Sequence, residues 1–92
     1  MEFDWSEKKQ RENLKKHGVD FQDAAYLFLD DYRVEWFDDR EDYGENRFVT
    51  IGAVEGRVLV VVYTERRSVI WLISARRTTK QERRQYETQI RP

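Results

Sequence analysis

The sequence predicts an α+β fold: a small single domain, residues 1–92, with a central antiparallel sheet of about four strands, two N-terminal helices and one C-terminal helix. Three observations predict it. A chain of 92 residues can support only one hydrophobic core. Helix capping signals and helical periodicity fill its first third, whereas β-rich segments with short connections fill its second half. A further capping signal follows the last of these segments. We expect the helices to lie on one face of the sheet.

The first third of the chain carries a short strand and two helices. Phe3 and Trp5 alternate with polar neighbours, which is typical of a strand. Ser6 is suited to N-cap a helix that runs to about His17, and Gly18 supplies a left-handed stop. Asp20 is suited to cap a second helix, whose apolar residues recur at the helical period. These residues are Phe21, Ala24, Ala25, Phe28 and Leu29.

The second half predicts an antiparallel meander and a last helix. The segments with a β composition are 47–54, 57–64 and 69–74, with a weaker candidate at 33–37. The connections between the three stronger segments are short, as a meander requires. Thr79, followed three residues later by Glu82, forms a capping box that starts the helix. Its apolar stripe is sparse and uses Tyr86 and Ile90.

Composition excludes several function classes. The chain has no cysteine, so it has neither a disulfide framework nor a thiolate metal site. A single histidine leaves no transition-metal cluster, and the acids between residues 38 and 45 miss the spacing of a calcium loop. We therefore expect no metal and no cofactor, and we interpret those acids as a solvated loop. The longest apolar run, 58–63, is too short to span a bilayer, and no signal peptide is recognisable. We expect a cytoplasmic protein without membrane contact.

Charge is distributed unevenly along the chain. Residues 66–92 carry eight basic side chains against two acidic ones, whereas residues 30–46 carry eight acids against two arginines. The formal net charge is only −1, but the chain contains two regions of opposite charge. This asymmetry favours a polyanion site together with a region able to mask it.

Polar and basic residues share one predicted face of the first helix. Lys9, Asn13, Lys16 and His17 follow one another at helical spacing. A histidine among cations and an amide suits general acid or base work, or phosphate positioning. The alternative is that Lys16 and His17 only complement the helix dipole and that Asn13 is solvated, which the residues alone favour.

A second basic group continues from the last strand into the last helix. Guanidinium groups match phosphate oxygens bidentately and keep their charge, so this group suits a nucleic-acid backbone. Tyr86 follows and is suited to stacking on a base or donating a proton. The alternative, equally supported, is a solvated basic helix with the Arg83 stem and the Tyr86 ring packed on the sheet. The group consists of Arg76, Arg77, Lys80, Arg83 and Arg84.

Taken together, the motifs of this chain resemble the BrnT family of type II toxins over nearly its entire length. The most specific blocks are Lys16-His17-Gly18 and Ser74-Ala75-Arg76. The resemblance implies a RelE/ParE-like domain that acts as a metal-independent endoribonuclease, cleaves RNA, inhibits translation and arrests growth. It implies a BrnA-like ribbon-helix-helix antitoxin as partner, with operator DNA contacted only through that antitoxin. Trp71 departs from the family pattern, because members often carry an arginine there; it removes a cation or adds a stacking surface.

Within this resemblance, four residues are expected at catalytic positions. Arg47 and Arg76 are expected to stabilise phosphate, His17 to act as an acid or base, and Tyr86 to be a weaker candidate for general acid. Glu45 is a candidate to orient Arg47. The residues expected to bind RNA are Lys9, Asn13, Lys16, Arg77, Lys80 and Arg83.

Two other function classes remain open at this point. A ParE-like inhibitor of DNA gyrase shares the fold and needs no catalytic residues of its own. A non-catalytic module would use its basic surface to bind an acidic protein.

Overall fold

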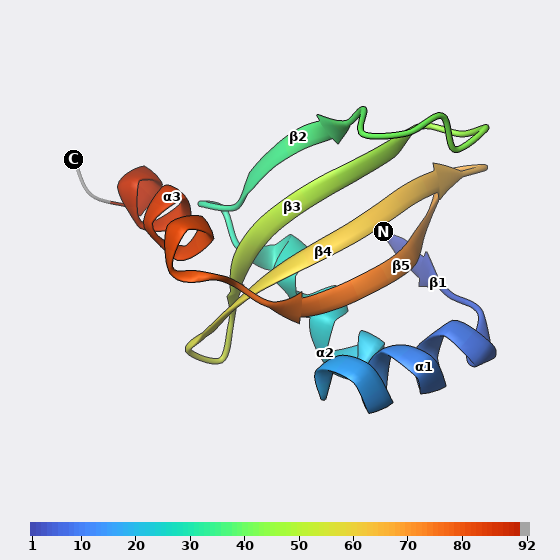
Figure 1. Ribbon diagram of the computed structural model, residues 1–92, viewed down its shortest axis with the longest axis horizontal. Coiled ribbons are helices and arrows are strands. Elements are labelled where there is room, and N and C mark those ends of the chain that lie inside the picture. Colours follow the sequence, from blue (N-terminus) through green and yellow to red (C-terminus); the bar gives the residue numbers. More distant parts are fainter. Residues whose placement is uncertain (91–92) are drawn as a thin grey trace.

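The computed structural model describes residues 1–90 and shows a five-stranded mixed sheet with helices on both faces (Figure 1). No helix in this part of the chain combines the length and the apolar character needed to cross a membrane. The elements, in chain order, are β1 (Glu2–Asp4), α1 (Glu7–His17), α2 (Phe21–Ala24), the 3₁₀ helix η1 (Ala25–Leu29), β2 (Val34–Asp38), β3 (Arg47–Val54), β4 (Arg57–Arg66), β5 (Val69–Arg77) and α3 (Lys80–Ile90).

The sheet has the strand order β1-β5-β4-β3-β2. The meander from β2 to β5 is antiparallel, as predicted, but β1 joins β5 as a parallel fifth strand, with Phe3 opposite Ile70. The expectation of an antiparallel sheet of about four strands therefore needs correction. The strand predicted at Phe3 is confirmed, but its partner, β5, is far away in the sequence. No local turn indicates their relative direction.

Local signals set the ends of the N-terminal helices as predicted. The Ser6 side chain accepts a hydrogen bond from the Lys9 N–H at 3.3 Å, and Gly18 ends α1 at a φ of 69°. The predicted second helix is split, because its α-helical turn changes to the 3₁₀ helix η1 at Ala25. A 3₁₀ helix has a shorter repeat than an α-helix, so Leu27 enters the core instead of Leu29, which is 74% exposed.

The closed face of the sheet, as we call it, is covered by α2 and η1 and holds the larger core. Phe21 and Leu27 are fully buried there against Leu59 and Val61 of β4. Gly52 of β3 allows this close packing, since a β-carbon at that position would lie 2.9 Å from the Cγ of Leu27. The approach of η1 to the sheet therefore depends on the missing side chain.

The open face is the opposite side, which α3 covers only in part. Tyr86 of α3 is 4% exposed and packs with Val49, Ile51 and Val60. These strand residues alternate with those of the closed face, so α3 lies on the other side of the sheet from η1. The expectation that all helices share one face is therefore wrong. β3 and β4 are apolar on both faces, and the second face also requires a cover.

Candidate functional site

The open face carries arginines beyond the part that α3 covers. Arg76 of β5 is opposite Val60, and Arg47 of β3 has the same strand parity as Val49, so both side chains leave the sheet on this face. Both are only partly exposed, at 37% for the Arg76 side chain and 24% for that of Arg47. Two of the four predicted catalytic residues thus lie on one surface.

Glu82 holds Arg76 in place. The Arg76 guanidinium donates two hydrogen bonds of 2.8 Å to the Glu82 carboxylate and a third of 3.1 Å to the carbonyl oxygen of Arg77. Glu82 also accepts from the Thr79 N–H at 2.8 Å, which confirms the predicted capping box. The hydrogen bonds from Arg76 lower the pKa of Glu82 to about 2. One carboxylate therefore caps α3 and orients Arg76, and the second role was missed from the sequence.

Glu45 holds Arg47 and Arg66 together. Its carboxylate lies 3.4 Å from the Arg47 Nε and 2.9 Å from an Arg66 Nη atom. Burial raises the pKa of Glu45, but the hydrogen bonds and charges of Arg66 and Arg47 together outweigh this effect and lower it. The Arg47 guanidinium lies 4.2 Å above the Tyr43 ring, and that of Arg66 lies 4.9 Å above the Trp71 ring. Trp71 thus supports a cation instead of supplying one.

The acidic segment is partly an ion-pair network and not only a solvated loop. Asp38 is 3% exposed, and its carboxylate accepts two hydrogen bonds of 2.8 Å from the Arg40 guanidinium. These bonds lower the pKa of Asp38 to about 2. The expectation of a solvated loop fails at Asp38, which is the buried last residue of β2 and pairs with Arg40, but Asp39, Glu41 and Asp42 are exposed as expected.

His17 ends α1 one helical turn beyond Asn13, whose amide binds Ala75, the residue before Arg76. The C-terminal end of α1 packs beside β5, and His17 is half-buried there. Partial burial, the charge of Lys16 and the charge of Arg76 all lower the pKa of His17. The structure therefore brings the only histidine of the chain to the end of β5 that carries Arg76.

Asn13 is a structural residue and not part of an exposed polar face. It is 6% exposed, and its side chain accepts from the Ala75 N–H at 3.0 Å and donates to the Ala75 carbonyl at 2.8 Å. It also donates to the Val19 carbonyl at 3.0 Å. The amide thus supplies the hydrogen bonds that a neighbouring strand would give to Ala75, which lies beyond the part of β5 paired with β1. The expected RNA contact at Asn13 needs correction, and so does the alternative of a solvated side chain.

Tyr86 is likewise packed and not free for catalysis. Its ring belongs to the core beneath α3, as the alternative interpretation stated, and its hydroxyl donates to the Asp30 carboxylate. The same carboxylate accepts from the Ala53 N–H at 2.8 Å. Burial and the contact with Asp30 raise the pKa of Tyr86 to about 12. A buried hydroxyl held by a carboxylate is a poor general acid, so we do not assign Tyr86 a catalytic role.

Five of the predicted RNA-binding residues are exposed, and three of them line one cleft. Lys9 and Lys16 are exposed on α1. Arg77, Lys80 and Arg83 surround a cleft of about 220 Å³ between the β3–β4 turn and the start of α3. Arg57 also lines this cleft and was missed, since only the sheet register brings the start of β4 opposite the end of β5.

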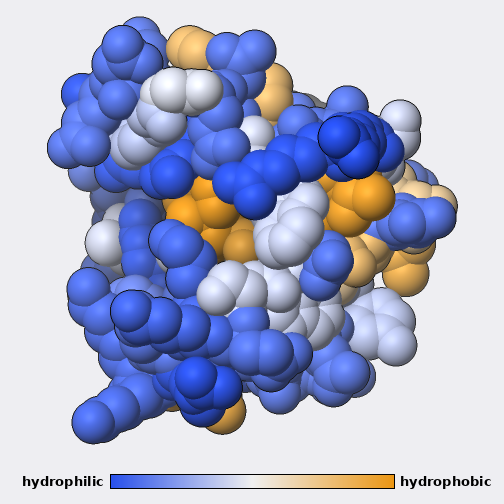
Figure 2. Space-filling model, turned by 90° about the vertical axis from the view of Figure 1, so that its right-hand side faces the viewer, coloured by the Kyte–Doolittle hydropathy of each residue, from blue (hydrophilic) through white to orange (hydrophobic). Residues whose placement is uncertain are grey.

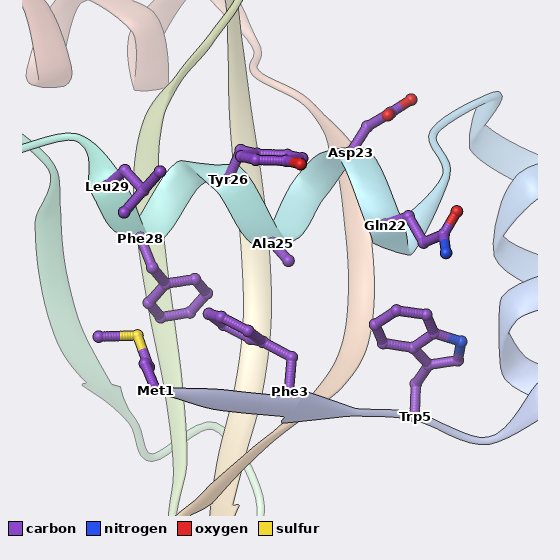
Figure 3. Close-up of a pocket in the computed structure, with 9 residues that line it drawn as sticks. All are labelled: Met1, Phe3, Trp5, Gln22, Asp23, Ala25, Tyr26, Phe28 and Leu29. Carbon is purple, nitrogen blue, oxygen red and sulfur yellow. The ribbon is translucent and has the colours of Figure 1, made fainter.

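A second cavity, of about 760 Å³, is a mainly apolar groove between β1 and the α2–η1 segment (Figure 3). It opens on the closed-face side of the molecule and has no basic side chain in its wall. Figure 2 shows the end of the molecule with the β4–β5 turn, where apolar atoms occupy a central area within a mainly hydrophilic surface. The residues that line the groove are Met1, Phe3, Trp5, Gln22, Asp23, Ala25, Tyr26, Phe28 and Leu29.

A small α+β domain with oriented arginines on an open sheet face has the features of a protein that acts on a polyanion. The sequence profile of the family described as "Ribonuclease toxin, BrnT, of type II toxin-antitoxin system" matches residues 5–82, and the chain belongs to this family. Membership identifies a type II toxin of the ribonuclease class and implies an antitoxin partner. A comparison with curated proteins finds no match.

Proposed function

We propose that the protein is an endoribonuclease that cleaves RNA without a metal ion. A ribose 2′-hydroxyl attacks the adjacent phosphate, the P–O5′ bond breaks, and the departing 5′-oxygen takes up a proton from water. The observation that carries this proposal is that α1, held to Ala75 by the Asn13 amide, brings His17 to the end of β5 that carries Arg76. The reaction needs a proton acceptor for the 2′-hydroxyl and cations for the dianionic transition state. These two residues supply one of each.

Arg76 stabilises the phosphate in this proposal. Its bidentate contact with Glu82 fixes the plane of the guanidinium, so little side-chain freedom is lost when RNA binds. The side chain remains 37% exposed, and its three hydrogen bonds leave further N–H donors for phosphate oxygens. Arg47, oriented by Glu45 and Tyr43, contributes a second cation on the same face.

His17 acts as the proton acceptor. Because its pKa is lowered by burial and by neighbouring cations, the imidazole is largely neutral at neutral pH and has a free lone pair. Protonation as the pH falls through the lowered pKa removes this function. Lys16, exposed beside His17, contacts the RNA backbone.

In the cell, cleavage inhibits translation and arrests growth in the cytoplasm. A BrnA-like ribbon-helix-helix antitoxin neutralises the toxin and mediates any contact with operator DNA. Family membership supports the existence of the antitoxin, and the basic surface around β5 and α3 suits an acidic antitoxin segment. Copurification of the product of the adjacent reading frame tests this part.

The activity is tested by incubating the purified protein with RNA in the presence of EDTA. We expect cleavage to persist in EDTA and to leave 2′,3′-cyclic phosphate ends, because the nucleophile is the ribose hydroxyl. Intact RNA at micromolar protein concentrations would contradict the proposal. Inhibition of DNA gyrase by protein that leaves RNA intact would favour the ParE-like alternative instead.

A further inference from the structure

The cation-lined cleft between the β3–β4 turn and the start of α3 is distinct from the surface that carries Arg76. Arg76 and Arg77 are consecutive residues of β5, so their side chains leave opposite faces of the sheet. The cleft has Arg77 in its wall, whereas Arg76 bonds to Glu82. A hydrogen bond of 3.2 Å from the Thr78 N–H to the Val58 carbonyl joins the two walls. This backbone hydrogen bond therefore fixes the cleft at the place where β5 ends and α3 begins.

The cations of the cleft lack the carboxylates that accompany the arginines of the open face. Arg47, Arg66 and Arg76 each form an ion pair of 3.4 Å or less. Within residues 1–90, by contrast, no carboxylate oxygen lies within 4.0 Å of the charged atoms of Arg57, Arg77 or Lys80; the fourth cation, Arg83, has only a 3.8 Å contact with Glu87.

Four like charges around so small a volume repel one another, and a bound anion removes this repulsion. The cleft is also accessible to a backbone, because the rest of its lining is Gly56 and the short side chains of Val58, Thr78 and Thr79. Guanidinium groups favour phosphate oxygens, which they bind with two parallel hydrogen bonds. The chemistry of the cleft thus matches one phosphate group of a nucleic acid.

We propose that this cleft anchors a phosphate of the RNA backbone at a nucleotide beyond the one that is cleaved. The inference rests on the proposed function and extends it to a second subsite. An RNA strand that crosses the end of β5 meets Arg76 on one side and the cleft on the other. The four cations act on binding and not on the chemical step, so their loss raises KM and leaves kcat unchanged.

The test compares two variants that each lose two charges. Arg57→Gln with Lys80→Gln removes two cations of the cleft, and Arg11→Gln with Arg67→Gln removes two exposed arginines outside it. Binding of a fluorescein-labelled single-stranded 12-mer with 2′-O-methyl riboses, which cannot be cleaved, is measured by fluorescence anisotropy. We expect the Kd of the cleft variant to rise about tenfold, and its log Kd to depend on log salt with a slope smaller by about 0.7 per lost phosphate contact.

Replacement of single phosphates by neutral methylphosphonates locates the contact. One substitution away from the scissile position is expected to weaken binding of the wild-type protein, and to have no effect on the cleft variant. Equal losses in both charge variants, or a wild-type Kd in the cleft variant, would overturn the inference. Lys80→Gln alone serves if the double variant fails to fold. Because the probe is not cleaved, these results are independent of the EDTA experiment, whose failure would overturn only the catalytic proposal.

Discussion

The two faces of the sheet use the same strands for different purposes. The closed face is filled by apolar side chains such as Phe21 and Leu27, which are fully buried. The open face has a smaller core beneath α3 and, beside it, arginines fixed by carboxylates. The apolar core that stabilises this protein therefore lies mainly on the closed face, and its paired arginines lie on the open face. Substitutions on the two faces should therefore separate folding from RNA cleavage.

Removal of a closed-face aromatic ring is expected to have the largest effect. Phe21→Ala should lower the free energy of unfolding by about 3–5 kcal/mol, because the ring is fully buried and leaves a cavity. Chemical denaturation measures the loss. Leu29→Ala is the control, since this side chain is 74% exposed and should change the value by less than about 0.5 kcal/mol. Equal effects would contradict the assignment of the core to this face.

On the open face, Arg76→Ala is expected to reduce the rate of RNA cleavage by at least about 100-fold, which corresponds to about 3 kcal/mol of transition-state stabilisation. Its free energy of unfolding should change by less than about 1 kcal/mol, because the ion pair with Glu82 is partly exposed. Single-turnover cleavage and denaturation measure the two quantities. Arg67→Ala, which removes an exposed cation of the β4–β5 turn, should leave the rate unchanged. Normal cleavage by the Arg76 variant would remove its proposed role.

Asn13 lies between the two faces, at the edge of β5. Asn13→Ala should lower the free energy of unfolding by about 2 kcal/mol, because the Ala75 N–H and carbonyl lose their partner in a buried position. The same denaturation experiment checks it, with the exposed Lys9→Ala as control on the same helix. A variant that kept its stability and lost only RNA affinity would restore Asn13 as an RNA contact.

Tyr86→Phe tests whether the hydroxyl under α3 is structural. We expect a loss of about 1 kcal/mol in stability from the missing hydrogen bond to Asp30, and an unchanged cleavage rate. Asp30 keeps its bond from the Ala53 N–H, which limits the loss. A tenfold slower cleavage at unchanged stability would mean that the hydroxyl takes part in the reaction.

The smallest expected effect is the loss of stability at acidic pH. The pKa of Glu82 is lowered from 4.5 to about 2 in the folded protein, so its ionised form stabilises the fold above about 4.5 and this contribution is lost as the pH falls towards 2. Glu82→Gln cannot titrate, and its stability should therefore decline less than that of the wild type over this interval. Denaturation curves at stepwise lower pH compare the two. Parallel declines would show that the pair with Arg76 is weaker in solution than its geometry indicates.

Local signals explain which parts of the structure the sequence predicted. The Ser6 cap, the Gly18 stop and the capping box of Thr79 with Glu82 each depend on residues within one helical turn. The antiparallel meander likewise depends on short turns. The parallel pairing of β1 and the position of α3 on the second face depend on contacts between distant segments, and local patterns do not encode these contacts.

The candidate site follows the same rule. His17 and Arg76 were recognised through motifs, but their proximity follows from the packing of α1 beside β5. No motif in the sequence marks Arg57 as a site residue, because only the pairing register of β4 and β5 places it opposite the end of β5. Asn13 was misread because helical spacing places it on a face without revealing that this face meets a strand edge. Burial, which decides such cases, is a property of the fold.

The side chain of Asn13 also covers part of a sheet edge. β1 is short and covers β5 only as far as Trp71, so the remainder of that edge would present unpaired backbone groups to any other extended chain. The amide of Asn13 occupies the N–H and carbonyl of Ala75 and holds α1 across this opening. A helix attached by one amide thus closes a sheet edge that a longer first strand would otherwise have to cover.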